Sequence, residues 1–252
     1  MDDSTPRLDG QVALVTGAAH RIGAAIARRL HGAGMNLVIH YRSSATAAET
    51  LATELNGRRA DSATALGADL LDLAALGPLA DAAAAAFGRL DLLVNNASTF
   101  YPTPVAEATP QQWDDLIGSN LRAPFFLAQA ARPHLKARHG AIVNIVDIHA
   151  DRPLAEHPIY SISKAGLAML TRSLARELGP EVRVNGVAPG AILWPEAGLS
   201  AAEQQAILDR AVLGRRGDPD DIARAVLYLY RDAGYVTGHV LPVDGGQSLV
   251  LR

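Results

Sequence analysis

Tyr160 and Lys164 stand four residues apart, and their types and spacing suit acid–base chemistry. On a helix such residues lie on one face, a turn apart, so the phenol and the ammonium group would be close together. A free phenol has a pKa of about 10 and exchanges protons poorly at neutral pH, whereas a nearby cation favours its ionised form. The spacing therefore predicts an acid site, although a single copy of it also occurs on ordinary exposed helices.

Small residues fill segment 16–23, with the sequence TGAAHRIG, between a predicted strand and a predicted helix. Such a turn lets backbone N–H groups at a helix N-terminus approach a pyrophosphate, where the helix dipole favours an anion. This position predicts a dinucleotide site with Gly17 and Ile22 at the phosphates. Arg21 is interpreted as a ligand of the phosphates or the substrate, because a buried arginine is otherwise costly. The alternative for Arg21 is a solvated charge on the first helical turn.

The end of the predicted second strand carries no carboxylate. Residues 40–44 read HYRSS, and the next acidic residue is Glu49. An NAD enzyme would place an acid here for the ribose hydroxyls, and that acid would repel a 2′-phosphate. Arg42 can pair with the phosphate, and Ser43 or Ser44 can donate hydrogen bonds to it. With Tyr41 beside them, these residues predict NADPH as the cofactor; the alternative for Arg42 is a solvated loop arginine.

Two more strand ends contribute to the predicted cofactor site. After the third predicted strand come Asp69 and Leu70, and Asp69 either accepts from the adenine amino group or caps the next helix. After the fourth, the amides of Asn95 and Asn96 can hold neighbouring strands together, while the small Ala97 leaves room for the cofactor.

Apolar runs alternate with helix-period stretches along the chain, a pattern typical of βαβ units and a parallel sheet. The predicted strands are Val12–Thr16, Leu37–Tyr41, Ala63–Leu66, Leu92–Asn95, Ala141–Val146, Arg183–Val187 and His239–Pro242. The predicted helices are Arg21–Gly32, Ala45–Leu55, Leu73–Phe87, Gln111–Ala137, Pro158–Leu178, Ala201–Ala211 and Pro219–Tyr230. The fold class is therefore α/β: a single-domain, Rossmann-like, doubly wound parallel sheet with helices on both faces. It is expected over residues 10–252, after a flexible N-terminus at residues 1–9.

Composition excludes several classes of function. The 252 residues include no cysteine, which rules out disulfides, thiolate metal sites and a cysteine nucleophile. The eight histidines form no metal-binding motif, so no metal is predicted. A net charge of −3 gives no sign of a nucleic-acid or anionic-membrane partner. The N-terminus is polar, and no run reaches the roughly 18 apolar residues of a membrane span, so we expect a cytoplasmic protein.

Taken together and in order, the glycine turn, the Asn95–Ala97 segment and the Tyr160–Lys164 pair resemble the short-chain dehydrogenase/reductase family over essentially the whole chain. The resemblance implies hydride transfer from NADPH, with Tyr160 and Lys164 at the cofactor and Lys164 bonded to the nicotinamide ribose. It further implies that Asn120 helps to hold a water chain to Lys164. Alternatively, Asn120 satisfies backbone groups at a helix break.

Further residues fit the same resemblance. Pro189 and Gly190, after the sixth predicted strand, are implied to pass the nicotinamide. Asn185 and segment 244–246 (DGG) also match the family pattern.

The chain departs from the usual family pattern at three positions. Arg21 replaces the middle glycine of the turn, and Ser98 follows the NNA segment where the family has glycine. Asp147 stands where the family usually has a serine that holds the substrate carbonyl. A carboxyl beside a phenol can relay a proton to a ring nitrogen; the alternative is a cap at the strand end. Phe100 is predicted to stack on a flat heteroaromatic ring or else to pack below its loop.

These departures resemble the pteridine reductase branch of the family. That resemblance implies reduction of dihydropterins, and in some members of oxidised pterins or dihydrofolate, with NADPH. Phe100 would sandwich the pterin against the nicotinamide, and Asp147 and Tyr160 would bind and protonate it. Arg21 and Ser98 would contact both cofactor and pterin.

A loop at residues 191–196 would cover this site. Its Trp194 would lie over the substrate or pack against a neighbouring subunit. The predicted helices Gln111–Ala137 and Pro158–Leu178 are pairing elements in family members, and the resemblance implies a homotetramer.

Two other functions remain open. One is a carbonyl reductase of the same family, acting on a 3-oxoacyl thioester, a sugar or a steroid. The other is a non-catalytic NADPH-binding sensor, against which the intact Asn120, Tyr160 and Lys164 weigh, because a sensor needs none of them.

Overall fold

Seven parallel strands form one sheet in the order β3-β2-β1-β4-β5-β6-β7 in the computed structural model, which describes residues 7–193, 198 and 200–250. The strands are β1 (Val12–Val15), β2 (Asn36–Tyr41), β3 (Ala63–Gly67), β4 (Leu92–Asn95), β5 (Ala141–Ile145), β6 (Arg183–Pro189) and β7 (Val240–Val243). The chain runs outward from β1 to β3, returns to place β4 on the other side of β1, and continues to β7. Ligands of such sheets bind at the carboxyl ends of the strands where the order reverses, here between β1 and β4.

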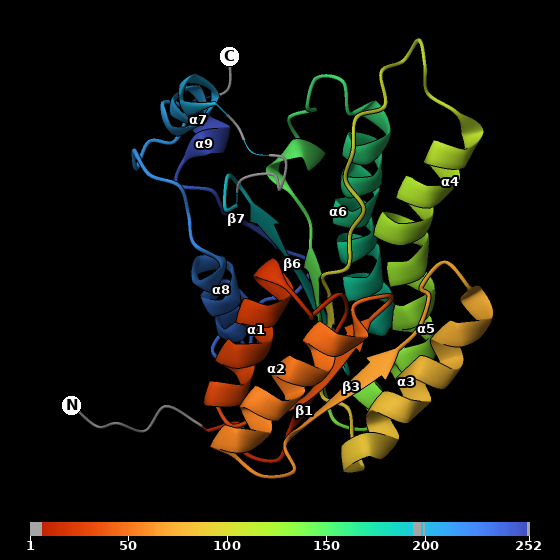
Figure 1. The fold of residues 1–252 in the computed structure, drawn as a ribbon. Helices are drawn as coiled ribbons and strands as arrows, with labels where there is room; N and C mark the ends of the chain where they lie inside the picture. The colour runs from red at the N-terminus through yellow and green to blue at the C-terminus, as the bar shows by residue number, and fades with distance from the viewer. Residues whose placement is uncertain (1–6, 194–197, 199, 251–252) are drawn as a thin grey trace.

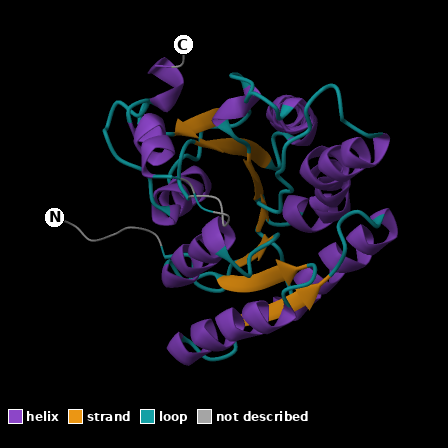
Figure 2. Ribbon diagram, turned by 45° about the horizontal axis from the view of Figure 1, so that its top comes forward, coloured by secondary structure: helices purple, strands orange, loops and turns teal. Residues whose placement is uncertain are grey.

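The helices are α1 (Arg21–Gly32), α2 (Ala45–Arg58), α3 (Leu73–Phe87), α4 (Pro110–Ile117), α5 (Ala123–Lys136), α6 (Pro158–Leu178), α7 (Ala201–Leu208), α8 (Pro219–Arg231) and α9 (Gln247–Val250). Helices α1, α2 and α8 share one apolar cluster on one face of the sheet, and α3, α5 and α6 share another on the opposite face. Figures 1 and 2 show these two helical layers with the sheet between them.

Strand β1 shows why the sheet is sandwiched. Its four residues, VALV, are all fully buried. Successive side chains point to opposite faces, so Ala13 and Val15 join the cluster under α1 and α8, while Val12 and Leu14 join the cluster under α3 and α5. A strand that buries both faces must be apolar throughout, which is the pattern that predicted a parallel sheet.

All seven predicted strands and all but one of the predicted helices are confirmed, with bounds that differ by up to three residues. One prediction was wrong in kind. The single helix expected over Gln111–Ala137 is two α-helices joined by a π-helical turn, η1 (Gly118–Arg122). A π turn has one more residue between its hydrogen-bonded groups than an α-helical turn has. The period of apolar residues along the sequence does not reveal this extra residue. The short helix η2 (Ile148–Ala150) and α9 were not predicted.

Within the described part of the chain, no helix is both long enough and apolar enough to cross a membrane.

Candidate active site

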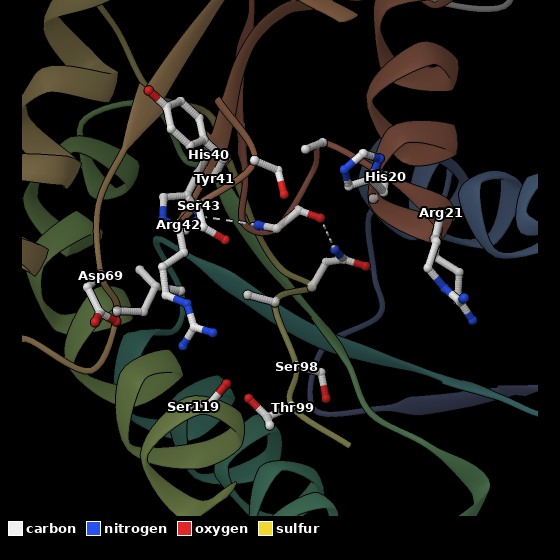
Figure 3. Close-up of a pocket in the computed structure, with 18 of the residues that line it drawn as sticks. His20, Arg21, His40, Tyr41, Arg42, Ser43, Asp69, Ser98, Thr99 and Ser119 are labelled. Atoms are coloured by element: carbon white, nitrogen blue, oxygen red, sulfur yellow. Dashed lines mark hydrogen bonds between the residues drawn. The ribbon is translucent and has the colours of Figure 1, made fainter. Parts of the chain in front are cut away.

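A cavity of about 400 Å³ lies at the carboxyl ends of β1, β2 and β4. It is lined by Gly17, Ala19, His20, Arg21, Ile22, Gly23, His40, Tyr41, Arg42, Ser43, Ser44, Asp69, Leu70, Leu71, Asn96, Ala97, Ser98, Thr99 and Ser119. Figure 3 shows side chains from several of these segments around one opening. The structure thus brings together most of the predicted cofactor ligands. Asn95, Pro189 and Gly190 do not line this cavity, nor do Tyr160 and Lys164.

The glycine turn is built for close backbone approach. Gly17 has φ +59°, and a Cβ there would lie 2.9 Å from the Cα of Ala97. A Cβ on Gly23 would lie 2.5 Å from the carbonyl oxygen of Gly17. Helix α1 starts directly after His20, whose side chain makes no capping hydrogen bond. The N–H groups in the first turn of a helix have no partner within the helix, so this end of α1 is suited to an anion.

Side chains from neighbouring strands hold this turn. The N–H of Gly17 donates to Nδ1 of His40 at 3.1 Å, and its carbonyl accepts from Nδ2 of Asn96 at 3.1 Å, as the dashed lines in Figure 3 mark. Nδ2 of Asn95 donates to Oδ1 of Asn144 at 2.8 Å, which ties β4 to β5. The prediction that the Asn95 and Asn96 amides lock neighbouring strands is confirmed. The role of His40 was missed; its one signal in the sequence is a polar residue inside the apolar run of β2.

Positive charge dominates the cavity. Among the described lining residues the one acid is Asp69, against the guanidinium groups of Arg21 and Arg42. Asp69 does not cap α3: its Oδ1 accepts from Leu71 N at 3.0 Å, and Asp72 caps the helix instead. The capping alternative for Asp69 is therefore wrong. The donors, the charge and the close backbone approach at Gly17 together fit a dinucleotide with phosphate groups.

Arg21 differs from its prediction in one respect. Its position was expected to be buried, but the residue is exposed and adopts a left-handed conformation with φ +52°. The burial argument for its role is therefore wrong. Arg21 nevertheless lines the cavity, beside the first turn of α1.

Asp147, Tyr160 and Lys164 meet at the end of β5. The hydroxyl of Tyr160 donates to Oδ2 of Asp147 at 2.8 Å. Nζ of Lys164 donates to the carbonyl of Ile145 at 3.0 Å and lies 5.6 Å from the centroid of the Tyr160 ring. Tyr160 and Lys164 lie on the buried face of α6, and Asp147 is half-buried. A phenol, a carboxylate and an ammonium group are thus held within one small volume.

The protonation of this group differs from the sequence-based expectation. Burial raises the pKa of Tyr160 well above its ordinary value, and the charge of Asp147 and its hydrogen bond raise it further. Burial lowers the pKa of Lys164 to about 8, although the charge of Asp147 opposes this shift. Tyr160 therefore keeps its proton at neutral pH and is poised as a donor. The pKa of Tyr160 was expected to be lowered, but burial, followed by the charge and hydrogen bond of Asp147, raises it.

Both carboxylate oxygens of Asp147 accept hydrogen bonds, and the predicted capping role is confirmed. Besides accepting from Tyr160, it accepts from His149 N through Oδ1 at 2.9 Å and caps η2. One carboxylate oxygen is thus structural and the other faces the phenol.

Asn120, in η1, holds the loop that carries Phe100. Its Nδ2 donates to the carbonyl of Thr99 at 2.9 Å and to Oγ of Ser163 at 3.1 Å. Its Oδ1 accepts from Thr99 N at 2.8 Å and from Oγ of Ser98 at 3.1 Å. The side-chain amide is therefore fully used in satisfying backbone groups and hydroxyls, as the alternative reading held, and it joins the loop to α6.

Phe100 is 51% exposed, so the alternative that it packs beneath its loop is wrong. Its ring stacks on that of His157 with centroids 4.7 Å apart, and it meets the Tyr160 ring edge-to-face at 4.8 Å. An exposed, oriented aromatic ring beside the phenol is a surface for a flat ligand. The sequence gives no spacing signal for His157, which lies far from Phe100 along the chain.

Pro189 is the last residue of β6 and Gly190 follows it, and the N–H of Gly190 donates to the carbonyl of Val243 at 3.1 Å. A Cβ on Gly190 would lie 2.7 Å from Cβ of Asp244, so the close contact requires glycine. Trp194 lies outside the described residues. Across residues 7–193, 198 and 200–250, no cluster of three or more potential ligands is placed to hold a metal ion.

Comparison with known proteins places the chain among oxidoreductases. A family model described as enoyl-(acyl carrier protein) reductase matches residues 17–248. Pteridine reductase 1 of Leishmania tarentolae is 36% identical, covering 94% of this chain and 96% of the relative. A putative ketoacyl reductase 2 of granaticin polyketide synthase from Streptomyces violaceoruber is 37% identical, covering 98% and 100%. The 3-oxoacyl-[acyl-carrier-protein] reductase of Staphylococcus aureus (strain N315) is 36% identical, covering 94% and 98%.

Proposed function

The chain belongs to the short-chain dehydrogenase/reductase family, whose members bind NAD(P)H, and from that premise we propose that it is an NADPH-dependent reductase of dihydropterins. The observation that carries the proposal is the hydrogen bond between Tyr160 and Asp147 next to the exposed ring of Phe100. Reduction of a carbonyl and of a C=N bond each takes up one proton, at oxygen or at nitrogen. A neutral hydroxyl at the position of Asp147 would suffice to hold a carbonyl oxygen, whereas a carboxyl there can relay a proton toward a ring nitrogen.

Reduction of a C=N bond adds a hydride to its carbon and a proton to its nitrogen. NADPH, when bound, supplies a hydride to the carbon of a C=N bond. Tyr160 holds the proton that the nitrogen must take up, because its pKa is raised by burial and by Asp147. Asp147 is half-buried and lies 2.8 Å from the phenol oxygen, so it can pass a replacement proton from solvent to Tyr160.

The walls of the site suit a flat substrate. Phe100 offers an aromatic face, and its orientation is supported by His157 and by the loop that Asn120 holds. Ser98 and Arg21 line the neighbouring cavity, so we assign them contacts with both cofactor and pterin. Oxidised pterins and dihydrofolate present the same ring system and belong to the same proposal.

The test is a comparison of substrates. Purified protein is mixed with NADPH and either 7,8-dihydrobiopterin or an acetoacetyl thioester, and the loss of the near-ultraviolet absorbance of NADPH is followed. Turnover of the pterin alone is the expected result. Turnover of the thioester alone would contradict the proposal and favour the second candidate.

That second candidate is a carbonyl reductase, and the names of the ketoacyl and 3-oxoacyl relatives favour it. Binding of NADPH with no turnover of any tested substrate would instead favour a sensor.

Arg42, Ser43 and Ser44 support the choice of NADPH over NADH. We predict that Arg42→Ala weakens NADPH binding about 10- to 100-fold, the worth of a charged hydrogen bond to phosphate, and leaves NADH binding nearly unchanged. Isothermal titration with each cofactor measures both. Arg58→Ala is the matched control, because this exposed arginine pairs with Glu54 away from the cavity. Equal losses for the two cofactors would contradict the assignment.

Assembly as a homotetramer is part of the same proposal. Exposed apolar side chains on α4, α5 and α6, among them Trp113, Phe125 and Met169, offer surface for a second copy. Light scattering of the purified protein measures the state directly, and a monomer would contradict it.

A further inference from the structure

His40 joins two segments of the cavity wall through its side chain. It is the penultimate residue of β2 and is 1% exposed. The N–H of Gly17 donates to its Nδ1 at 3.1 Å, and its Nε2 lies 3.1 Å from the carbonyl oxygen of Ala68. Its own carbonyl accepts from Ala18 N at 2.9 Å. Both ring nitrogens of His40 and its backbone carbonyl are therefore hydrogen-bonded to segments that line the cavity.

These two bonds determine the state of the ring. A backbone N–H can only donate, so Nδ1 must be unprotonated to accept from Gly17. A backbone carbonyl can only accept, so Nε2 must carry the hydrogen. The imidazole is therefore neutral, in the Nε2–H form. Burial lowers the pKa of His40, which agrees with this state, although Ala68 and the charge of Asp69 oppose the shift.

The two partners lie on different sides of the cofactor cavity. Gly17 belongs to the turn before α1, where a pyrophosphate is expected, and Ala68 directly precedes Asp69 and Leu70, where the adenine is expected. Figure 3 shows the glycine turn and Asp69 on separate sides of the opening, with the end of β2 between them. Backbone bonds tie each segment to the end of β2, from Ala18 N to the carbonyl of His40 at 2.9 Å and from Ala68 N to the carbonyl of Tyr41 at 3.0 Å. The imidazole adds a second bond to each segment and, among the described residues, is the one side chain that links both.

We propose that His40 is a positioning residue for the cofactor: its neutral ring fixes the distance between the glycine turn and the end of β3 before the dinucleotide binds. Because the two segments are already ordered, the binding of the dinucleotide does not lose the entropy needed to order them, and its affinity is higher. The inference depends on the binding of NADP-type cofactors and not on the identity of the substrate.

Three substitutions of His40 distinguish the contribution of its bond to Gly17 from that of its bond to Ala68. In His40→Asn the side-chain oxygen can occupy the place of Nδ1 and keep the bond from Gly17. In His40→Gln the side-chain nitrogen can reach the place of Nε2 and keep the bond to Ala68. His40→Phe loses both. We expect a fall in NADPH affinity of about tenfold for each backbone group left unpaired, so His40→Phe is the weakest binder and the two amides are intermediate.

A fragment of the cofactor distinguishes the two walls. Adenosine 2′-monophosphate carries the adenine and the 2′-phosphate but does not reach the glycine turn. Its affinity, measured by isothermal titration, should be retained in His40→Gln and reduced in His40→Asn. Equal affinities of the two variants for this fragment would overturn the proposal.

His31→Leu is the matched control for loss of a buried histidine. His31 is 3% exposed and bonds to Oγ of Ser62 at 2.8 Å, near the far end of α1, about 15 Å along the helix axis from its first residue. It should lower the thermal unfolding midpoint without changing NADPH affinity. An equal loss of NADPH affinity in His31→Leu would mean that general destabilisation explains the effect, and would overturn the proposal.

Nitrogen NMR of the cofactor-free protein tests the ring state directly and needs no variant. A protonated Nε2 and an unprotonated Nδ1 at neutral pH are expected. A doubly protonated ring, or a hydrogen on Nδ1, would overturn the proposal. Each readout concerns the protein or its binding of cofactor, so failure of the pterin assay leaves this test unaffected.

Discussion

Replacing Tyr160 with phenylalanine is expected to lower kcat for reduction by roughly 10²- to 10⁴-fold, the range for loss of a positioned general acid. The hydroxyl is the one proton-bearing group of the ring, and it is already bonded to Asp147 at 2.8 Å. The ring itself stays packed against Leu116 and Ile159, so the fold should persist. Steady-state kinetics with NADPH and a dihydropterin measure the loss, and titration of NADPH reports that the cofactor site is intact.

Tyr101→Phe is the matched control for this variant. Tyr101 also donates to a carboxylate, Oδ2 of Asp115 at 2.9 Å, but it does not line the cofactor cavity. It should lose a hydrogen bond of the same kind with little change in kcat. A similar loss in both variants would show that packing, and not proton donation, explains the effect.

The same kinetics followed against pH report on Lys164. Its pKa is lowered to about 8, chiefly by burial, so it is charged below this pH and neutral above it. The cation stabilises the phenolate that remains after Tyr160 gives up its proton. We therefore expect kcat for reduction to fall as the pH rises through about 8, and an unchanged rate across that pH would contradict the role of the cation.

Replacing Asp147 with serine is expected to change the preferred substrate. Serine keeps a side-chain oxygen that can cap η2 at His149 N, so the local structure should survive. It removes the carboxylate that returns a proton to Tyr160, so pterin kcat/KM should fall by roughly 10²-fold, whereas turnover of a carbonyl substrate should rise. Parallel assays with a dihydropterin and an acetoacetyl thioester measure both changes.

The charge of Asp147 makes a second difference that can be measured. Because it raises the pKa of Tyr160, its removal should move the tyrosine ionisation to lower pH. Asp151→Ser, at an exposed acid in the same loop, is the control and should alter neither property. Pterin turnover that is unchanged in Asp147→Ser would refute the assignment of this residue.

The spacing of residues in the sequence was enough to predict the strands and several groups of the site. Alternation of apolar runs and helical periods predicted the seven strands, because a strand buried on both faces must be apolar throughout. The Tyr160–Lys164 pair could be placed on one helical face, because the i, i+4 relation is a property of the helix itself. The glycine turn and the amides of Asn95 and Asn96 could be assigned to the cofactor end of the sheet, because each lies at the end of a predicted strand.

Tertiary structure alone decided how those groups behave. Tyr160 lies on a helix and Asp147 at a strand end, and only their packing buries the phenol and brings the carboxylate to it. Burial first, and Asp147 second, then raise the pKa of Tyr160. Burial could not be inferred for Arg21, which proved exposed, because exposure depends on what packs over a turn.

The supports of the site were equally hidden from the sequence. His40 acts on Gly17 and Ala68, which are distant along the chain, and Asn120 acts on Thr99 from a π turn that apolar periodicity does not encode. Spacing determines relations within one element, whereas hydrogen-bond partners and pKa values depend on the distances between elements, and those distances are set only when the sheet and its helices pack.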